Sequence, residues 1–248
     1  MTVFIDIVGS WGARSENPDT IAKRLARWFA ALTEIDPLFE HWKRGGMRNR
    51  SVVPQMIESL PPNVAELRDW VAENPSFGSR DGYKQELGFR VHARTPQETG
   101  LFADFWLWTS HTQSPGWFDN RISVTFYPIE RSETSYLITL SRAALLASAA
   151  TWDCEWVAVA PGNYSNVRLA PGKLPEKFAS GWMVYLDKTH ADKMLEPEDI
   201  TVERLDAGAV RRTAIKKEIF DRSNLIHRAA ARRIQAALAP LNAEAEGA

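Results

Sequence analysis

Hydrophobic residues recur at helical spacing near both ends of this 248-residue chain and at strand spacing between them. Close to the start, the apolar run Val3–Val8 is typical of a buried strand. The residues after it are apolar every third or fourth position, which predicts one buried stripe on a helix. Asn17 and Pro18 occupy the positions expected for the cap and the first residue of that helix. The stripe consists of Ile21, Leu25, Trp28, Leu32 and Ile35.

The middle of the chain changes to a period of two after a second predicted helix, Asn63–Glu73. Three segments show this alternation or are apolar on both faces: Leu87–Ala93, Leu101–Thr109 and Ile122–Phe126. They predict a three-stranded antiparallel meander whose middle strand is covered on both sides. The basic stretch Lys43–Arg50 contains two glycines and is typical of a surface loop.

The last third of the chain mixes both patterns. Helices are expected at Ser141–Ala150 and Ser223–Leu238, and short strands at Glu155–Ala160, Gly181–Leu186, Ile200–Leu205 and Ala209–Ile215. The whole pattern predicts an α+β fold, with a mainly antiparallel sheet and flanking helices at both ends of the chain. No composition break marks a boundary, so we expect a single domain over residues 1–241 and a frayed tail over 242–248.

Charge and cysteine content narrow the classes of function. Thirty basic and 31 acidic residues give a net charge of −1, so no general field attracts nucleic acid or an anionic membrane. Cys154 is the only cysteine, which excludes an intrachain disulfide and fits a reducing compartment. The start has no signal-peptide pattern and no stretch is apolar over the roughly 20 residues of a membrane span. We therefore expect a cytoplasmic protein that binds neither membranes nor nucleic acid directly.

The search for catalytic chemistry yields few candidates. Asp187, His190 and Asp192 form the best metal-like cluster, but a solvated loop after a strand explains it better. Cys154 is better explained as a core residue than as a nucleophile. None of the common phosphate-binding, nucleotide-binding or nucleophile motifs is present. We expect no enzyme, no metal and no cofactor; the alternative is a hydrolase or transferase that uses Asp187, His190 or Cys154.

The aromatic and acidic residues suggest binding instead. Trp106 and Trp108 share one face of a predicted strand, where they form either a stacking platform for sugars or bases or the underside of a covering helix. The covering helix is the commoner arrangement, because large exposed apolar patches are rare. The segment from Asp187 to Asp199 has five acidic residues against two lysines, which favours a basic partner protein.

Three motifs in order along the chain carry a resemblance to a known family. The first is "WGARSENPDTIAKRLARWFAALTEIDPLFEHW" (Trp11–Trp42), the second is "GWMVYLD" (Gly181–Asp187), and the third is "VERLDAGAVRRTAIKKEIFDRSNLIHRAA" (from Val202). Together they resemble the bacterial immunity protein 52 family. The resemblance covers both ends of the chain, and the stretch from Val53 to Lys177 contributes little. It implies a cytoplasmic α+β protein that neutralises a cognate toxin, often a nuclease of restriction-endonuclease-like type, by forming a stoichiometric complex.

The resemblance also implies roles for residues. Specificity between related inhibitors belongs in loops, so we expect the shared motifs to be scaffold. Trp11 is then a packing residue rather than a toxin contact, and Gly12 permits a tight turn. The structural motif residues are Trp11, Gly12, Asp36, Pro37, Phe39, Trp42, Gly181, Trp182, Tyr185, Glu218 and Phe220. The expected toxin-binding residues are the surface positions Arg14, Glu16, Asp187, Asp192, Glu196, Glu198 and Asp199.

Overall fold

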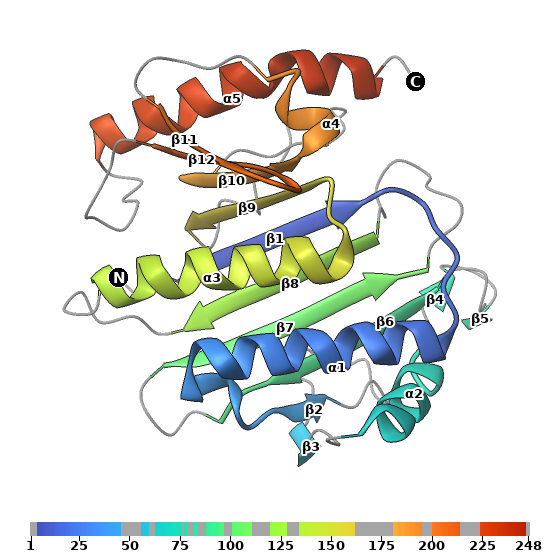
Figure 1. Ribbon diagram of the computed structural model, residues 1–248. Helices are drawn as coiled ribbons and strands as arrows, with labels where there is room; N and C mark the ends of the chain where they lie inside the picture. The colour runs from blue at the N-terminus through green and yellow to red at the C-terminus, as the bar shows by residue number, and fades with distance from the viewer. Residues whose placement is uncertain are drawn as a thin grey trace. The chain divides into compact units, whose positions relative to one another are not determined.

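The predicted α+β class is confirmed: the strands pair mainly antiparallel, with helices near both ends of the chain (Figure 1). The computed structural model describes residues 4–45, 56–59, 63–75, 77–78, 82–83, 88–96, 101–110, 120–127, 134–161, 181–194, 200–213 and 224–246. Two compact units emerge, Ser10–Pro128 (the inserted unit) and Met1–Gly9 with Ile129–Ala248 (the flanking unit). The single domain over residues 1–241 stays a prediction.

Strand β1 (Ile5–Trp11) leads the chain into the inserted unit and helix α1 (Pro18–Ile35) follows it. The start of α1 is as predicted: the Asn17 side chain accepts a hydrogen bond from the Thr20 N–H at 2.9 Å, and Pro18 occupies the first turn. Asp36 ends α1 and caps the short helix η1 (Pro37–Phe39), because its carboxylate accepts from the Leu38 N–H at 2.8 Å.

The sheet of the inserted unit has the order β8-β7-β6-β2-β3, and all of these neighbours are antiparallel. The predicted meander is confirmed as β6 (Phe89–Arg94), β7 (Phe102–Thr109) and β8 (Asn120–Tyr127). The remaining elements are β2 (Lys43–Gly45), β3 (Met56–Ser59), α2 (Val64–Ala72), β4 (Phe77–Gly78) and β5 (Gly82–Tyr83).

The start of the expected surface loop is a strand instead. Lys43–Gly45 pairs with both β3 and β6, so its backbone hydrogen bonds are made within the sheet. Three residues are too few to show the alternation of a strand. The prediction therefore relied on the basic, glycine-containing composition, which suggested a loop. The rest of that stretch, 46–50, lies outside the described residues.

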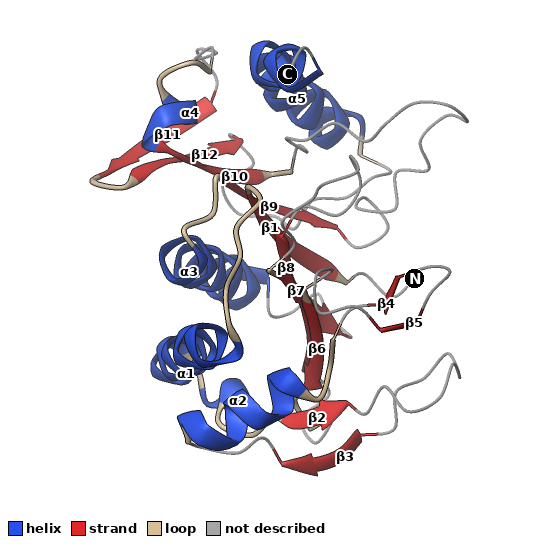
Figure 2. Ribbon diagram, turned by 90° about the vertical axis from the view of Figure 1, so that its right-hand side faces the viewer, coloured by secondary structure: helices blue, strands red, loops and turns tan. Residues whose placement is uncertain are grey.

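Helices α1 and α2 lie on the same side of this sheet (Figure 2). The core beneath α1 is aromatic: the Trp28 and Phe105 rings are 4.5 Å apart, and Trp42 stacks on Phe39 at 5.9 Å. All four side chains are at most 5% exposed. Burial of each such side chain contributes about 1.5–3 kcal/mol to the stability of the fold. The face of β7 that carries Phe105 is therefore the core face of the sheet.

The flanking unit contains the strands β9 (Trp156–Pro161), β10 (Met183–Asp187), β11 (Ile200–Leu205) and β12 (Gly208–Thr213). Their order is β11-β12-β10-β9, antiparallel throughout. Helices α3 (Thr134–Trp152) and α5 (Leu225–Glu246) lie on opposite sides of these strands (Figure 2), and the single turn α4 (Lys188–Ala191) follows β10.

Helix α5 is longer than its sequence predicts, and residues 242–246 of the expected frayed tail are helical. The helix continues through Pro240, although a proline removes one backbone donor. Its buried stripe explains why: Ile234, Leu238 and Leu241 pack in one core cluster with β9 and β10 residues such as Trp156 and Val184. Burial on this face outweighs the local cost of the proline.

Two glycines permit close approach between strands of the flanking unit. A Cβ atom on Gly181 would lie 2.2 Å from the Val159 carbonyl oxygen, and one on Gly208 would lie 2.2 Å from the Leu186 carbonyl oxygen. Both neighbours are backbone atoms that cannot move aside without disturbing the sheet. The glycine of the "GWMVYLD" motif is therefore required by packing.

Candidate functional site

The turn between β1 and α1, expected to carry surface contacts, is built around a buried carboxylate. Glu16 has a side chain that is only 6% exposed, so the expectation of a surface residue is wrong for Glu16. Its oxygens lie 3.2 Å from Arg14 Nε and 2.8 Å from Arg24 Nε, as charge contacts rather than aligned hydrogen bonds. Thr109 also donates to this carboxylate, at 3.2 Å.

The backbone of Glu16 is fixed as firmly as its side chain. Its N–H donates to Ser110 Oγ at 2.8 Å, and the Ser110 hydroxyl donates back to the Glu16 carbonyl at 2.7 Å. We call Arg14, Glu16, Arg24, Thr109 and Ser110 the Glu16 cluster. Two cations and the Thr109 hydroxyl converge on the carboxylate, and the Ser110 hydroxyl holds the backbone of the same residue. This cluster therefore holds the turn in place, and the Glu16 carboxylate is already engaged within the fold.

The neighbouring motif residues are similarly enclosed. Trp11, at the end of β1, is 2% exposed, and the Arg14 guanidinium lies 5.0 Å from its ring centroid. The Gly12 carbonyl accepts a hydrogen bond from the Asn120 side chain at 2.8 Å. Arg14 keeps partial exposure, with 25% of its side chain accessible.

Only part of the expected acidic surface lies within the described residues. The contacts seen there join residues that are close together in the sequence. Asp187 ends β10 and caps α4: one carboxylate oxygen accepts from the His190 N–H at 2.9 Å and lies 2.6 Å from His190 Nδ1. Asp192 is exposed. Glu196, Glu198, Asp199, Glu218 and Phe220 lie outside the described residues.

The alternative catalytic residues are not brought together by the described chain. Cys154 is 1% exposed, and its thiol lies 3.5 Å from the Ser148 carbonyl in the manner of a core residue. No group of three metal-binding side chains occurs within the described ranges. Tyr185 donates to the Ala207 carbonyl at 3.0 Å, and burial, followed by the charge of Asp187, raises its pKa to about 12. A phenol with that pKa stays protonated near neutral pH.

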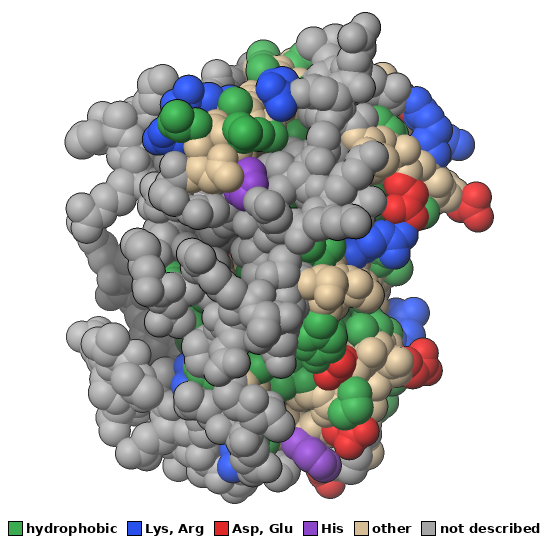
Figure 3. All heavy atoms as spheres, turned by 90° about the vertical axis from the view of Figure 1, so that its left-hand side faces the viewer, with side chains coloured by type: hydrophobic (Ala, Val, Ile, Leu, Met, Phe, Trp, Pro, Cys, Tyr) green, Lys and Arg blue, Asp and Glu red, His purple; other side chains and the backbone are tan. Residues whose placement is uncertain are grey.

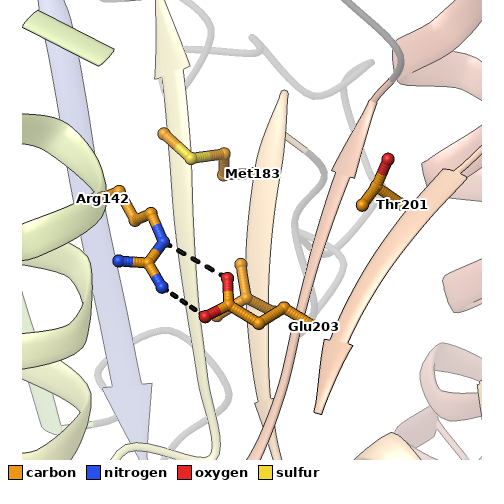
Figure 4. Close-up of a pocket in the computed structure, with 5 residues that line it drawn as sticks. Arg142, Met183, Thr201 and Glu203 are labelled. Atoms are coloured by element: carbon orange, nitrogen blue, oxygen red, sulfur yellow. Dashed lines mark hydrogen bonds and ion pairs between the residues drawn. The ribbon is translucent and has the colours of Figure 1, made fainter. Parts of the chain in front are cut away.

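A small pocket among the described residues of the flanking unit is occupied by an internal ion pair. Arg142 of α3 reaches over β10 to the Glu203 carboxylate on β11, and Met183, Thr201 and Val210 line the space around them (Figure 4). The room that remains is about 10 Å³, which is no more than one water molecule needs. This pair fastens α3 to the strands and offers no room for a substrate.

The side of the sheet in the inserted unit that faces away from α1 and α2 carries a different set of residues. Among the described elements of this unit, only the β4–β5 pair lies on the side away from α1 and α2 (Figure 2). On this side, Trp108 is paired in register with Arg90 on β6 and with Arg121 on β8. We call these three residues the Arg90 row. Arg90 and Trp108 are half-buried and Arg121 is exposed.

The Arg90 row is organised by contacts between cations and aromatic rings. The Arg90 guanidinium lies 4.6 Å from the Trp106 ring centroid and 5.2 Å from that of Trp108. Arg121 lies 5.9 Å from the Trp108 centroid. The two tryptophan rings are 5.7 Å apart and inclined by 17°. Contacts of this kind fix a guanidinium in position without neutralising its charge.

On the same side of the sheet, four residues before Trp108 on β7, the positive charge of an arginine is neutralised by an acid. Arg94 donates two hydrogen bonds to the Asp104 carboxylate, both at 2.7 Å, and His92 Nε2 lies 3.1 Å from the same acid. Burial alone would raise the pKa of Asp104, but the hydrogen bonds from His92 and Arg94 lower it overall. The His92 ring also stacks on Trp106 at 3.9 Å.

Arg90 has no such acid. Among the described residues, no carboxylate pairs with Arg90, and its buried Nε has no hydrogen-bond partner. Burial lowers the pKa of the Arg90 guanidinium, the direction expected where water is removed and no acid compensates. The guanidinium remains charged, because an arginine pKa lies far above neutral.

The sequence identified only part of this surface. The period of two placed Trp106 and Trp108 on one face, but the predicted covering helix is absent from the described part of that face. The partners of Trp108 depend on strand register, which joins residues 18 and 13 positions away. Arg90 and Arg121 alternate with buried residues on their strands, a weak signal that any exposed strand face also gives.

On the face that Figure 3 shows, the described charged side chains are of both signs and are interspersed, in keeping with the net charge of −1. No helix in the described ranges is both long and apolar enough to cross a membrane.

Comparison with known proteins supports the fold. No family model and no curated protein matches this sequence. Among solved structures, the chain is similar to the T6SS (type VI secretion system) protein PA0821 of Pseudomonas aeruginosa, with a TM-score of 0.52 and 8% sequence identity. The match covers 94% of this chain and 73% of that protein. At this identity the likeness concerns the fold, and the resemblance to the immunity protein 52 family stays a hypothesis.

Proposed function

We propose that this protein is an immunity protein, which binds a cognate bacterial toxin in a stoichiometric complex and neutralises it without catalysing a reaction. The Arg90 row is the observation that carries the proposal. Arginine and tryptophan are the residue types that dominate binding energy at protein interfaces, particularly where they are half-buried and held in position. The row carries both types on the side of the sheet away from α1 and α2, whereas the other side of the sheet is core.

Two further observations support toxin neutralisation as the purpose of the binding. The three ordered motifs at the ends of the chain resemble the immunity protein 52 family, for which a restriction-endonuclease-like nuclease is the expected toxin. The structural neighbour is by its name a T6SS protein, and its fold runs through almost the whole of this chain. Both observations are compatible with a partner that belongs to a secretion system.

The other functions considered have weaker support. A hydrolase or transferase would need Asp187, His190 or Cys154, yet Asp187 and His190 contact each other at the start of α4, and Cys154 is buried. A sugar-binding module would stack its ligand on Trp106 and Trp108. Arg90 lies over both rings and His92 stacks on Trp106, so these side chains already occupy ring surface that a sugar would need.

Co-expression with the toxin encoded beside this gene tests the proposal. We expect the wild-type protein to restore growth and to co-purify with the toxin in a fixed ratio, measured by light scattering on the isolated complex. An immunity protein stripped of divalent metals should inhibit the toxin as fully as the untreated protein, because binding alone inhibits. If both proteins are folded and neither rescue nor a complex is seen, the proposal is wrong.

A further inference from the structure

We infer that the Arg90 row binds a carboxylate-bearing segment of the partner protein, with one carboxylate seated on the Arg90 guanidinium. This inference rests on the proposed function and specifies the chemistry of the partner surface. It reverses the sequence-based expectation in one respect: here the immunity protein supplies the cation and the partner supplies the acid.

The contrast between Arg90 and Arg94 is the first argument. Both arginines lie on the same side of β6, four residues apart, and both are half-buried. Arg94 has Asp104 within its own sheet, held by two hydrogen bonds of 2.7 Å. On β7, the residue paired with Arg90 is Trp108, whereas the residue paired with Arg94 is the acid Asp104. Among the described residues, the half-buried Arg90 guanidinium therefore lacks the bidentate acid that its donor geometry suits.

The surroundings of Arg90 favour binding over chance exposure. The rings of Trp106 and Trp108 hold the guanidinium from one side and thereby reduce the side-chain entropy lost when a partner binds. They also exclude water, so an incoming carboxylate would meet a cation that is already partly desolvated. Arg121, on the far side of Trp108, adds a second positive charge at the exposed edge of the row.

A protein carboxylate fits this surface better than a single-stranded nucleic acid. Nucleic-acid platforms stack bases on accessible aromatic rings and follow the backbone with an extended basic groove. Here Arg90 and His92 already lie against the tryptophan rings. The next positions along β6 and β7 are neutralised by Asp104. One planar cation held over two indoles matches one carboxylate, not a chain of phosphates.

Charge-reversal variants test the inference in the complex with the toxin. We would measure the dissociation constants of the wild type, Arg90→Glu, Arg121→Glu and the control Arg27→Glu, an exposed arginine on α1. Arg90→Glu should weaken binding about 30-fold or more, the range of an interface hot spot, and Arg121→Glu should have a smaller effect. Arg27→Glu should bind like the wild type. Equal affinity of Arg90→Glu and Arg27→Glu in folded proteins would overturn the inference.

Thermal melting of each variant separates lost binding from lost folding, and Arg121→Glu, at an exposed position, keeps the test valid if Arg90→Glu unfolds. In that case, Arg121→Glu binding as tightly as Arg27→Glu overturns the inference, and weaker binding than the control supports it.

A second measurement examines the row without the toxin, so that failure of the proposed function can be recognised separately. The Arg90 Nε–H signal would be followed by NMR while hexaglutamate or a six-residue oligothymidylate is added. We expect hexaglutamate to shift this signal and 0.5 M salt, about three times physiological ionic strength, to reverse the shift by screening. No shift, or a larger shift with oligothymidylate, contradicts the inference. A hexaglutamate shift with no toxin complex refutes the proposed function alone.

Discussion

The Glu16 cluster and the Arg90 row contain the same residue types, but those residues have different roles. Each combines arginines with a tryptophan, and each lies in the inserted unit. In the cluster, Arg14 and Arg24 converge on one buried carboxylate, and Arg14 lies over Trp11. In the row, Arg90 lies over Trp106 and Trp108, and no described carboxylate pairs with it.

The difference shows that residue type alone does not reveal function. A guanidinium beside an internal acid stabilises the fold, because removing either partner leaves a buried charge uncompensated. A guanidinium held by aromatic rings alone contributes less to the fold and keeps its capacity for an external acid. The comparison predicts that mutations should separate stability from binding, and the predictions below test that separation.

The largest loss of stability is expected for Glu16→Gln. The variant removes the acid between Arg14 and Arg24, and breaking a buried pair of this kind costs about 3–5 kcal/mol. Urea denaturation gives the free energy of unfolding, with Glu34→Gln on the exposed side of α1 as the matched control. A loss as small as that of the control would show that the cluster does not hold the turn.

A smaller and pH-dependent loss is expected for Asp104→Asn. Because the pKa of Asp104 is lowered in the folded state, its contribution is fully present above the unfolded pKa near 3.8. That contribution is lost as the pH falls through the lower folded pKa. We expect the wild type to exceed Asp104→Asn by about 2 kcal/mol at neutral pH, as charge-assisted hydrogen bonds imply.

This difference should narrow as acid is added below about pH 4, where protonation of the wild-type carboxylate begins. His92 and Arg94 face Asp104, so the single variant Arg94→Ala, which keeps the carboxylate but loses the two hydrogen bonds from Arg94, should lose less stability over the same pH range. A difference that stays constant between pH 7 and pH 2 would contradict the role given to this acid.

A loss of about 1 kcal/mol is expected for Asp187→Ala, the usual cost of removing a helix cap. Its carboxylate accepts the His190 N–H at the start of α4. Toxin protection should persist in this variant, since Asp187 is then a structural residue. Growth under toxin expression checks the point, and lost protection in a folded Asp187→Ala protein would show that Asp187 takes part in neutralisation, as the sequence suggested.

The smallest effect on stability is expected for Arg90→Met. Replacing an uncompensated half-buried cation by a flexible apolar side chain should leave the free energy of unfolding within about 1 kcal/mol of the wild type. Arg24→Met, which leaves Glu16 with less charge compensation, should cost more under the same conditions. Equal losses in the two variants would remove the distinction between cluster and row.

Periodicity and capping rules predicted most of the framework. The start of α1 at Asn17 and Pro18, the meander of β6 to β8 and the α+β class follow from local patterns. Errors occurred where tertiary packing decides the outcome. The three-residue strand β2 exists because β3 and β6 supply its hydrogen bonds, and α5 continues past Pro240 because Leu241 is buried.

The candidate site was less predictable, because it depends on register. Nothing local distinguishes Arg90 from Arg94: both alternate with buried residues on one strand. Only pairing with β7 places one beside Trp108 and the other beside Asp104. Likewise, Glu16 follows a polar turn that suggests a surface, and its burial depends on Ser110, 94 residues further along the chain.

The most direct test measures stability and toxin affinity together in Glu16→Gln and Arg90→Gln, which carry matched changes to the same neutral residue. We predict that Glu16→Gln loses unfolding free energy but, under conditions where it is folded, binds the toxin like the wild type. Arg90→Gln should keep its stability and bind about tenfold or more weakly, as the loss of a single charge-assisted contact implies. If both variants lose stability and affinity in parallel, the row is part of the scaffold and binding lies elsewhere.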